Sequence, residues 1–243
     1  LDVTNTGKIG SNSWLFGGNV SGNAGIINID VLKSLMTTTG SISMWVNSAD
    51  IGSYNNARAI WCFGDTNADE KLLMQYDTNG GADRFSAFMK IAGTTVWSCQ
   101  SNDSSATEDN SFGSSNWQMI TLTHDGTEPK IYVNASEQTN NLGSTPTEWI
   151  SAGTGIDNGR IGVEDSNNVN NGYTRFLGDQ FLMYSHALTQ PEVTALYNGD
   201  GAGLGTTTPS TTGLLAHYDF EETSGTTLAN KSTELVWKQK GTA

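Results

Sequence analysis

Carboxylates interleaved with an amide form the first group of side chains in this sequence that could do chemistry. Asp65, Asn67 and Asp69 alternate along one short segment, as oxygen ligands do at the start of a calcium-binding loop. The match is weak, because Glu70 stands where such a loop needs glycine and Tyr76 stands where it needs a bidentate glutamate. We therefore treat these three residues as a secondary calcium hypothesis.

Aromatic rings in polar loops form the second group. Tyr54, Trp149 and Tyr173 lie in segments rich in Asn, Gly and Ser, where an exposed ring could stack on a sugar. Packing of each ring against its own loop is the alternative. Hydrolysis of a glycoside would need two carboxyl groups flanking the bond, and the closest acidic pair, Glu164 and Asp165, sits in a Ser/Asn-rich stretch. The sequence therefore predicts a protein that is not an enzyme.

The charge balance excludes several partners. The formal net charge is −13, so the chain repels nucleic acid and anionic membranes. The sequence contains no run of about 20 apolar residues, so no membrane span is predicted. Abundant Gly, Ser, Thr and Asn are typical of turn-rich extracellular proteins, and the chain begins with Leu1 rather than Met. We expect a processed product or a piece of a longer chain, located extracellularly, on a cell surface or on a virion surface.

Cys62 and Cys99 are the two cysteines of the sequence. Both sit in apolar runs with strand character, and two cysteines do not make a disulfide framework. A disulfide between them and a pair of buried thiols are both compatible with this pattern.

Short runs with strand character recur along the chain, separated by turn signals such as Asp125-Gly126. Many of them alternate apolar and polar residues, which places the apolar side chains on one face. The runs lie at residues 13–16, 40–46, 59–63, 71–76, 84–91, 94–100, 117–124, 130–134, 160–163 and 176–186. This spacing predicts an all-β fold, a two-sheet antiparallel jelly-roll sandwich.

One short helix is predicted near the C-terminus. Thr189 and Glu192 have the spacing of a capping box, and Pro191 suits the first helical turn. Val193 and Leu196 begin an apolar stripe at helical spacing.

The last part of the chain differs in character. Residues 199–212 read as a flexible linker rich in Gly and Thr. A strand-like run at 214–222 follows, and its backbone groups need a partner strand. We therefore divide the chain into a sandwich over 1–198, the linker, and a strand segment over 213–243.

Several sequence blocks follow one another in a recognisable order. They are residues 7–10 with 14–18, 41–46, 117–126, 130–134 and 178–193. Together they resemble the laminin-G-like, concanavalin A-like jelly-roll family, in which 117–134 matches the central hairpin and 178–193 the last strand and helix. The resemblance covers most of the chain and implies the same sandwich fold.

One block is displaced relative to that family. The family begins with a strand that resembles residues 213–222, which here stand at the far end of the chain. Three interpretations follow. The domain is circularly permuted and its last strand completes its own sheet in cis, the strand completes a neighbouring subunit in trans, or the chain is one period of a tandem array cut out of frame.

The resemblance also implies a metal. Proteins that resemble this one often hold a structural calcium where the first and last strands meet, and the matching positions are Asp179, Asp219 and Glu221. Carboxylates brought together without a cation would repel and raise each other's pKa. Exposed acids at strand ends are the alternative.

These observations predict a non-catalytic structural unit of an extracellular assembly, such as a surface filament, sheath or virion component. Its partners would be copies of itself or adjoining repeats, joined through the 213–243 strand, with calcium as a stabilising ion. The alternative is a glycan-binding or adhesion module of a larger surface protein, with glycans as partners. That alternative rests on the family resemblance alone.

Overall fold

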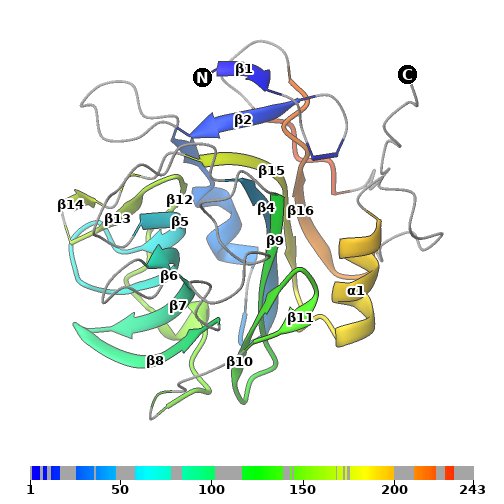
Figure 1. The fold of residues 1–243 in the computed structure, drawn as a ribbon. Helices are drawn as coiled ribbons and strands as arrows, with labels where there is room; N and C mark the ends of the chain where they lie inside the picture. The colour runs from blue at the N-terminus through cyan, green and yellow to red at the C-terminus, as the bar shows by residue number, and fades with distance from the viewer. Residues whose placement is uncertain are drawn as a thin grey trace, which may run out of the picture.

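A computed structural model gives the arrangement of the predicted strands (Figure 1). It describes residues 2–5, 8–9, 12–16, 26–35, 37–47, 58–77, 84–101, 117–138, 143, 145–167, 169–171, 173, 176–199, 211–222 and 228–232. Within these ranges, no helix is long and apolar enough to cross a membrane.

Two antiparallel sheets pack face to face. Sheet A has eight strands: β1 (Asp2–Asn5), β2 (Ser13–Phe16), β15 (Phe176–Tyr184), β4 (Gly40–Asn47), β9 (Trp117–His124), β10 (Pro129–Val133) and β11 (Ser136–Glu137) in spatial order, with β16 (Leu214–Tyr218) also paired to β15. Sheet B has six: β3 (Ile27–Asn28), β12 (Asn158–Ile161), β5 (Arg58–Gly64), β6 (Lys71–Asp77), β7 (Arg84–Ile91) and β8 (Thr94–Gln100). The predicted all-β sandwich is confirmed.

A third, two-stranded sheet lies against the outer side of β5. It consists of β13 (Glu164–Ser166) and β14 (Val169–Asn171). Figure 1 shows this hairpin on the side of sheet B that faces away from sheet A. The described residues also contain two 3-10 helices, η1 (Asp30–Leu35) and η4 (Ile150–Ala152).

Alternation along the strands decides what enters the core. On β7, Phe85, Ala87 and Met89 join the main buried cluster, while Ser86 and Phe88 lie on the opposite face. Burying one face of each sheet removes apolar surface from water and fixes the register, since a one-residue slip would turn every side chain over.

The short helix α1 (Gln190–Asn198) covers the outer face of sheet A. Val193 and Leu196 of α1 pack with Trp45 of β4 in a second buried cluster. The backbone N–H and the hydroxyl of Thr189 both donate to Glu192 Oε2 at 2.8 Å. The predicted helix and its capping pair are therefore confirmed.

β16 and β2 share one edge of β15. β16 pairs with the second half of β15, where Tyr218 stands opposite Phe181. β2 pairs with the first half, where Phe16 stands opposite Phe176. Both run antiparallel to β15, so they follow one another along the same edge and form a composite edge strand.

The strand segment thus pairs within its own chain in this structure. Phe220, just beyond β16, lies in the core with ring centroids 5.8 Å from Trp14 and 6.1 Å from Phe16. Residues 200–210 of the predicted linker lie outside the described residues, and the division of the chain into domains stays a prediction.

Both cysteines are free, buried thiols. Cys62 faces the outer side of sheet B under β13, and Cys99 faces the core. Burial raises the pKa of each thiol to about 12. The interpretation as two separate thiols is correct, because the two side chains leave their sheet on opposite faces.

Candidate functional site

Many of the charged and polar side chains of the described residues lie on the outer face of sheet B. This face is made of the side chains of β5 to β8 and β12 that point away from sheet A. Its centre is an apolar strip of Ala59, Cys62 and Leu73. This strip is itself buried, and Phe88, which packs against it, is half-buried.

Polar side chains continue the same face on one side of Phe88. The strand register places Gln75 opposite Ser86, and Gln75 Nε2 donates to Ser86 Oγ at 3.1 Å. The next outward pair along the two strands is Asp77 and Arg84. Phe88, Ser86 and Arg84 are spaced two residues apart, so Phe88 and Arg84 lie about 13 Å apart along β7.

Lysines and carboxylates pair on the other side of Phe88. Lys71 Nζ lies 2.5 Å from Glu164 Oε1 and 3.1 Å from Asp69 Oδ1, and Lys90 Nζ lies 2.7 Å from Asp69 Oδ2. Burial alone would lower the pKa of Lys71, which is 8% exposed, but Glu164 and then Asp69 raise it above its ordinary value. Burial would raise the pKa of Asp69, and the two lysines lower it. This network holds β13 onto sheet B.

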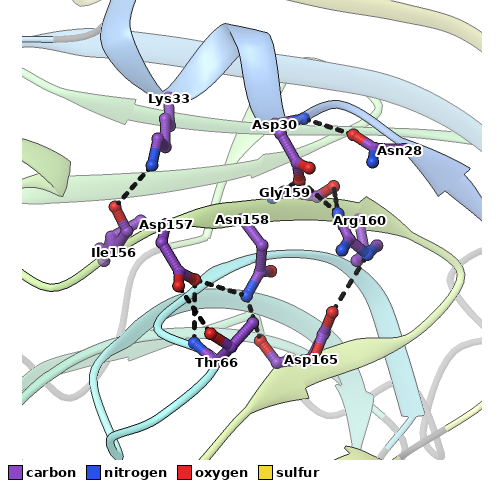
Figure 2. Close-up of polar contacts among 10 residues, drawn as sticks. All are labelled: Asn28, Asp30, Lys33, Thr66, Ile156, Asp157, Asn158, Gly159, Arg160 and Asp165. Carbon is purple, nitrogen blue, oxygen red and sulfur yellow. Dashed lines mark hydrogen bonds and ion pairs between the residues drawn. The ribbon is translucent and has the colours of Figure 1, made fainter.

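Arg160 on β12 is the third paired cation (Figure 2). Its guanidinium contacts Asp30 of η1 through Nη1, and its Nε lies 3.1 Å from Asp165 Oδ2 of β13. Nearby, Asp157 accepts hydrogen bonds from the backbone N–H of Thr66 at 2.9 Å and from its hydroxyl at 2.6 Å. These contacts hold η1, β12 and the β5–β6 loop together, and both ion pairs of Arg160 join elements of the fold.

Arg84 is the cation of this face that has no ion-pair partner among the described residues. The part of the chain described by the structure offers it no ion-pair partner within 4.0 Å, although Asp77 stands opposite it in the register. Its Nε is buried and makes no hydrogen bond. A guanidinium left in this condition favours an anionic group from outside the chain.

The predicted calcium residues lie at the junction of β2, β15 and β16. Asp179 on β15 is fully buried. Its Oδ2 accepts the N–H of Ile9 at 2.9 Å, and its buried Oδ1 has no hydrogen-bond partner. Burial, with a further contribution from the charge of Glu221, raises the pKa of Asp179 well above its ordinary value.

The other two carboxylates of this junction have partners of their own. Both carboxylate oxygens of Asp219 lie 2.7 Å from Lys231 Nζ, and Glu221 Oε1 accepts the N–H of Asn12 at 3.2 Å. The described residues contain no group of three or more His, Cys, Asp or Glu side chains arranged to hold a metal. Calcium binding here stays a prediction, and it would require Asp219 to release Lys231.

The secondary calcium hypothesis meets a different geometry. Asp65 Oδ1 accepts the N–H of Asn67 at 2.7 Å, which closes a local turn. Asp69 is paired with Lys71 and Lys90. Calcium binding by these three residues stays a prediction. Glu70, next to them, is buried and accepts the N–H of Gly155 at 2.6 Å.

The aromatic candidates divide into three outcomes. Trp149 is 1% exposed, and its ring stacks on His124 at 4.9 Å and on Trp97 at 6.2 Å. Its prediction as a glycan platform is therefore wrong, because the ring fills the core below η4. Tyr173 is half-buried and stays a prediction. Tyr54 lies outside the described residues.

Phe88, Gln75 and Arg84 are not among the site residues predicted from the sequence. The predicted sugar-binding rings lie in loops, whereas these three residues lie on strands. The signal was present, since alternation within the predicted runs at 71–76 and 84–91 already places them on the face opposite to the apolar residues.

With this geometry in place, the family can be compared. A family model described as the concanavalin A-like lectin/glucanases superfamily, Laminin_G_3, matches residues 21–194. The chain belongs to this superfamily. No curated protein sequence matches it significantly. The match covers the strands from β3 to β15 and the first half of α1, and it leaves out β1, β2 and β16. The displacement of the last strand stays a prediction.

Solved structures of this superfamily fold extend the likeness. The CBM40 of Ruminococcus gnavus IT-sialidase bound to α2,3 sialyllactose gives a TM-score of 0.58 at 13% identity, over 71% of this chain and 91% of that chain. A mutant of NanB sialidase from Streptococcus pneumoniae gives 0.58 at 14% identity, over 75% and 27%. The Botulinum neurotoxin serotype D binding domain gives 0.53 at 17% identity, over 80% and 44%. At these identities the likeness shows the fold, and the chain spans only about a quarter of the NanB chain.

Proposed function

We propose that this chain is a non-catalytic glycan-binding module, and that it binds through the outer face of sheet B around Phe88, Gln75 and Arg84. The observation that carries the proposal is Arg84, an uncommitted guanidinium on a face where the other cations are paired. The CBM40 neighbours, named as bound to α2,3 and α2,6 sialyllactose, support a sugar as the ligand.

The three side chains supply complementary chemistry. A half-buried aromatic ring stacks on the C–H face of a sugar, and an amide exchanges hydrogen bonds with its hydroxyls. A guanidinium pairs with a carboxylate in bidentate fashion. The separation of about 13 Å between Phe88 and Arg84 suits a short oligosaccharide with an acidic sugar at one end. We therefore infer a sialylated or similarly acidic glycan.

The charge of the whole chain sets the conditions for this binding. A net charge of −13 repels an anionic glycan at a distance. At physiological ionic strength the Debye length is about 8 Å, so the local guanidinium dominates once the sugar is in contact. Affinity should therefore rise when salt is increased from very low concentration.

Calorimetric titration with 3′-sialyllactose and with lactose tests the proposal. We expect Arg84→Gln to weaken sialyllactose binding about tenfold, the loss of one charge-assisted contact, and to leave lactose binding unchanged. Lys130→Gln, on the opposite sheet, is the matched control. Equal binding of the two sugars by the parent, or an unchanged affinity in Arg84→Gln, would sink the proposal.

A structural unit of an extracellular assembly is the second candidate. The observation that favours it is the composite edge strand, because β16 could pair with β15 of another copy in the same register. In that reading the partners are copies of the chain, and extracellular location is common to both candidates.

A further inference from the structure

A cleft of about 290 Å³ opens on the outer face of sheet A, on the side of the molecule opposite the face discussed above. It lies between the β9–β10 turn, β11 and the first turn of α1, which Figure 1 shows facing one another. Gln190 Nε2 donates to the backbone oxygen of Ala135 at 2.6 Å and so holds α1 against the β10–β11 turn. The cleft is therefore framed by elements that are tied to one another.

The floor of the cleft is apolar and aromatic. Tyr132 and Leu188 reach it from the buried cluster under α1, and each is 3% exposed as a whole residue. Burial raises the pKa of Tyr132 to about 12, and the negative charge of Glu137 and then its hydrogen bond to Tyr132 add to the rise. The phenol therefore stays a hydrogen-bonding hydroxyl at any physiological pH.

The walls of the cleft carry more negative than positive charge. Asp125, Glu128 and Glu137 contribute three carboxylates, and Lys130 contributes one ammonium, so the formal sum is −2. Lys130 Nζ lies 3.4 Å from Glu137 Oε2 and compensates that carboxylate only. Asp125 Oδ1 accepts a hydrogen bond from the backbone N–H of Thr127 within the β9–β10 turn. Glu128 has no hydrogen-bond or ion-pair partner for its carboxylate among the described residues.

Volume and lining together define the ligand. A cleft near 300 Å³ is at the small end of ligand pockets, so it takes one ring rather than a chain of sugars. Carboxylates, an amide and a phenol are acceptors and donors for vicinal hydroxyls. The surplus of negative charge disfavours an acid and favours an ammonium group.

We propose that this cleft is a second binding site, which takes a single sugar ring and prefers an amino sugar to a neutral sugar, and a neutral sugar to an acidic one. The proposal does not depend on the function assigned to sheet B, because the two surfaces lie on opposite sheets and select opposite charge. A module with both sites would bind glycans that carry acidic and amino sugars at different positions.

NMR titration of the ¹⁵N-labelled full chain with D-glucosamine, methyl α-D-glucoside and D-glucuronate tests the ranking. We expect saturable chemical-shift changes at Gln190 and Glu137. Affinity should be highest for D-glucosamine, lower for methyl α-D-glucoside and lowest for D-glucuronate. Glu128→Gln and Glu137→Gln should each weaken glucosamine binding about threefold to fivefold, which is the size of one exposed charge interaction. Asp77→Asn, an acid-to-amide change on sheet B, should leave it unchanged.

Each contrary result has a defined meaning. Tight binding of glucuronate, or unaltered affinity in both glutamate variants, overturns the cleft as the site. Methylammonium binding as strongly as glucosamine overturns the sugar and leaves a plain cation site. Arg84→Gln should retain glucosamine binding, while Glu137→Gln should retain sialyllactose binding, so that failure of this proposal is distinguishable from failure of the first one. Melting temperatures confirm that each variant is folded.

Discussion

His217 on β16 and Asp179 on β15 are buried titratable residues of two paired strands, and through them a fall in pH changes the stability in opposite directions. His217 Nε2 lies 2.6 Å from Gln180 Oε1, and Asp179 precedes Gln180 on β15. Burial lowers the pKa of His217 to about 4, while burial raises the pKa of Asp179. The folded chain therefore keeps the imidazole neutral and holds the carboxyl proton more tightly than the unfolded chain does.

The histidine makes a pH-dependent contribution that can be isolated. The pKa of His217 is below its unfolded value of 6.5, so the unfolded chain gains the proton first and stability falls as the pH drops from about 6.5 toward 4. Between pH 7 and pH 5, urea unfolding of the parent should lose about 2 kcal/mol more than that of His217→Gln. Asp179 acts in both proteins and cancels in the difference. His186→Gln, outside this junction, controls for loss of a histidine, and identical pH profiles of parent and His217→Gln would contradict the argument.

Residue environments explain why Trp149 does not form the predicted glycan platform. Trp149 and Tyr173 both follow polar stretches in the sequence, yet one ring fills the core and the other is half-buried. A single aromatic residue in a loop belongs to no alternating pattern, so the sequence does not predict whether its ring points into the core or into solvent. Strand residues such as Phe88 do carry one, so their outward direction was predictable although their role was not.

At the scale of elements, periodicity and composition predicted most of the sandwich. The predicted runs at 84–91, 94–100 and 117–124 coincide with β7, β8 and β9. The missed strands, β1, β3, β11, β13 and β14, are two to four residues long, too short to show alternation. β1, β3 and β11 form because β2, β12 and β10 supply their partners, and β13 and β14 pair with each other against β5, which are tertiary effects.

The junction of β2, β15 and β16 allows a test of calcium against Lys231. The ammonium of Lys231 already neutralises Asp219, so calcium must compete with it. We expect added calcium, relative to chelator, to raise the melting temperature more in Lys231→Met than in the parent, because the variant leaves Asp179, Asp219 and Glu221 without a cation. Lys130→Met removes an exposed pair on β10 and serves as the control. An equal calcium response in all three proteins would remove this junction as a calcium site.

At the scale of the whole molecule, the sandwich separates its chemistry by face. Sheet B presents Arg84 and Phe88 on the same strand, sheet A presents the acidic cleft beside α1, and the composite edge strand lies on sheet A next to β15. Neither face uses residues of the composite edge. The proposed glycan binding and the proposed exchange of the last strand between copies therefore involve different residues, and either proposal can be tested without disturbing the other.

Exchange of β16 between copies has a defined concentration dependence. The same contacts, including Tyr218 opposite Phe181 and Phe220 in the core, would form within one chain or between two. The outcome therefore depends on whether another copy outcompetes the strand that is tethered in the same chain, and tethering typically gives an effective concentration of about 1 mM.

We accordingly expect light scattering at about 10 µM to give the monomer mass of 25.9 kDa. Chain refolded from denaturant near 1 mM and then diluted should contain multimers, because strands that pair in trans at high concentration separate only by partial unfolding. Phe220→Ala should shorten the lifetime of those multimers, since it weakens the packing of the exchanged segment. A monomer under both conditions would contradict the structural-unit candidate, whereas multimers already at 10 µM would show that pairing between copies is intrinsically stronger than pairing within one.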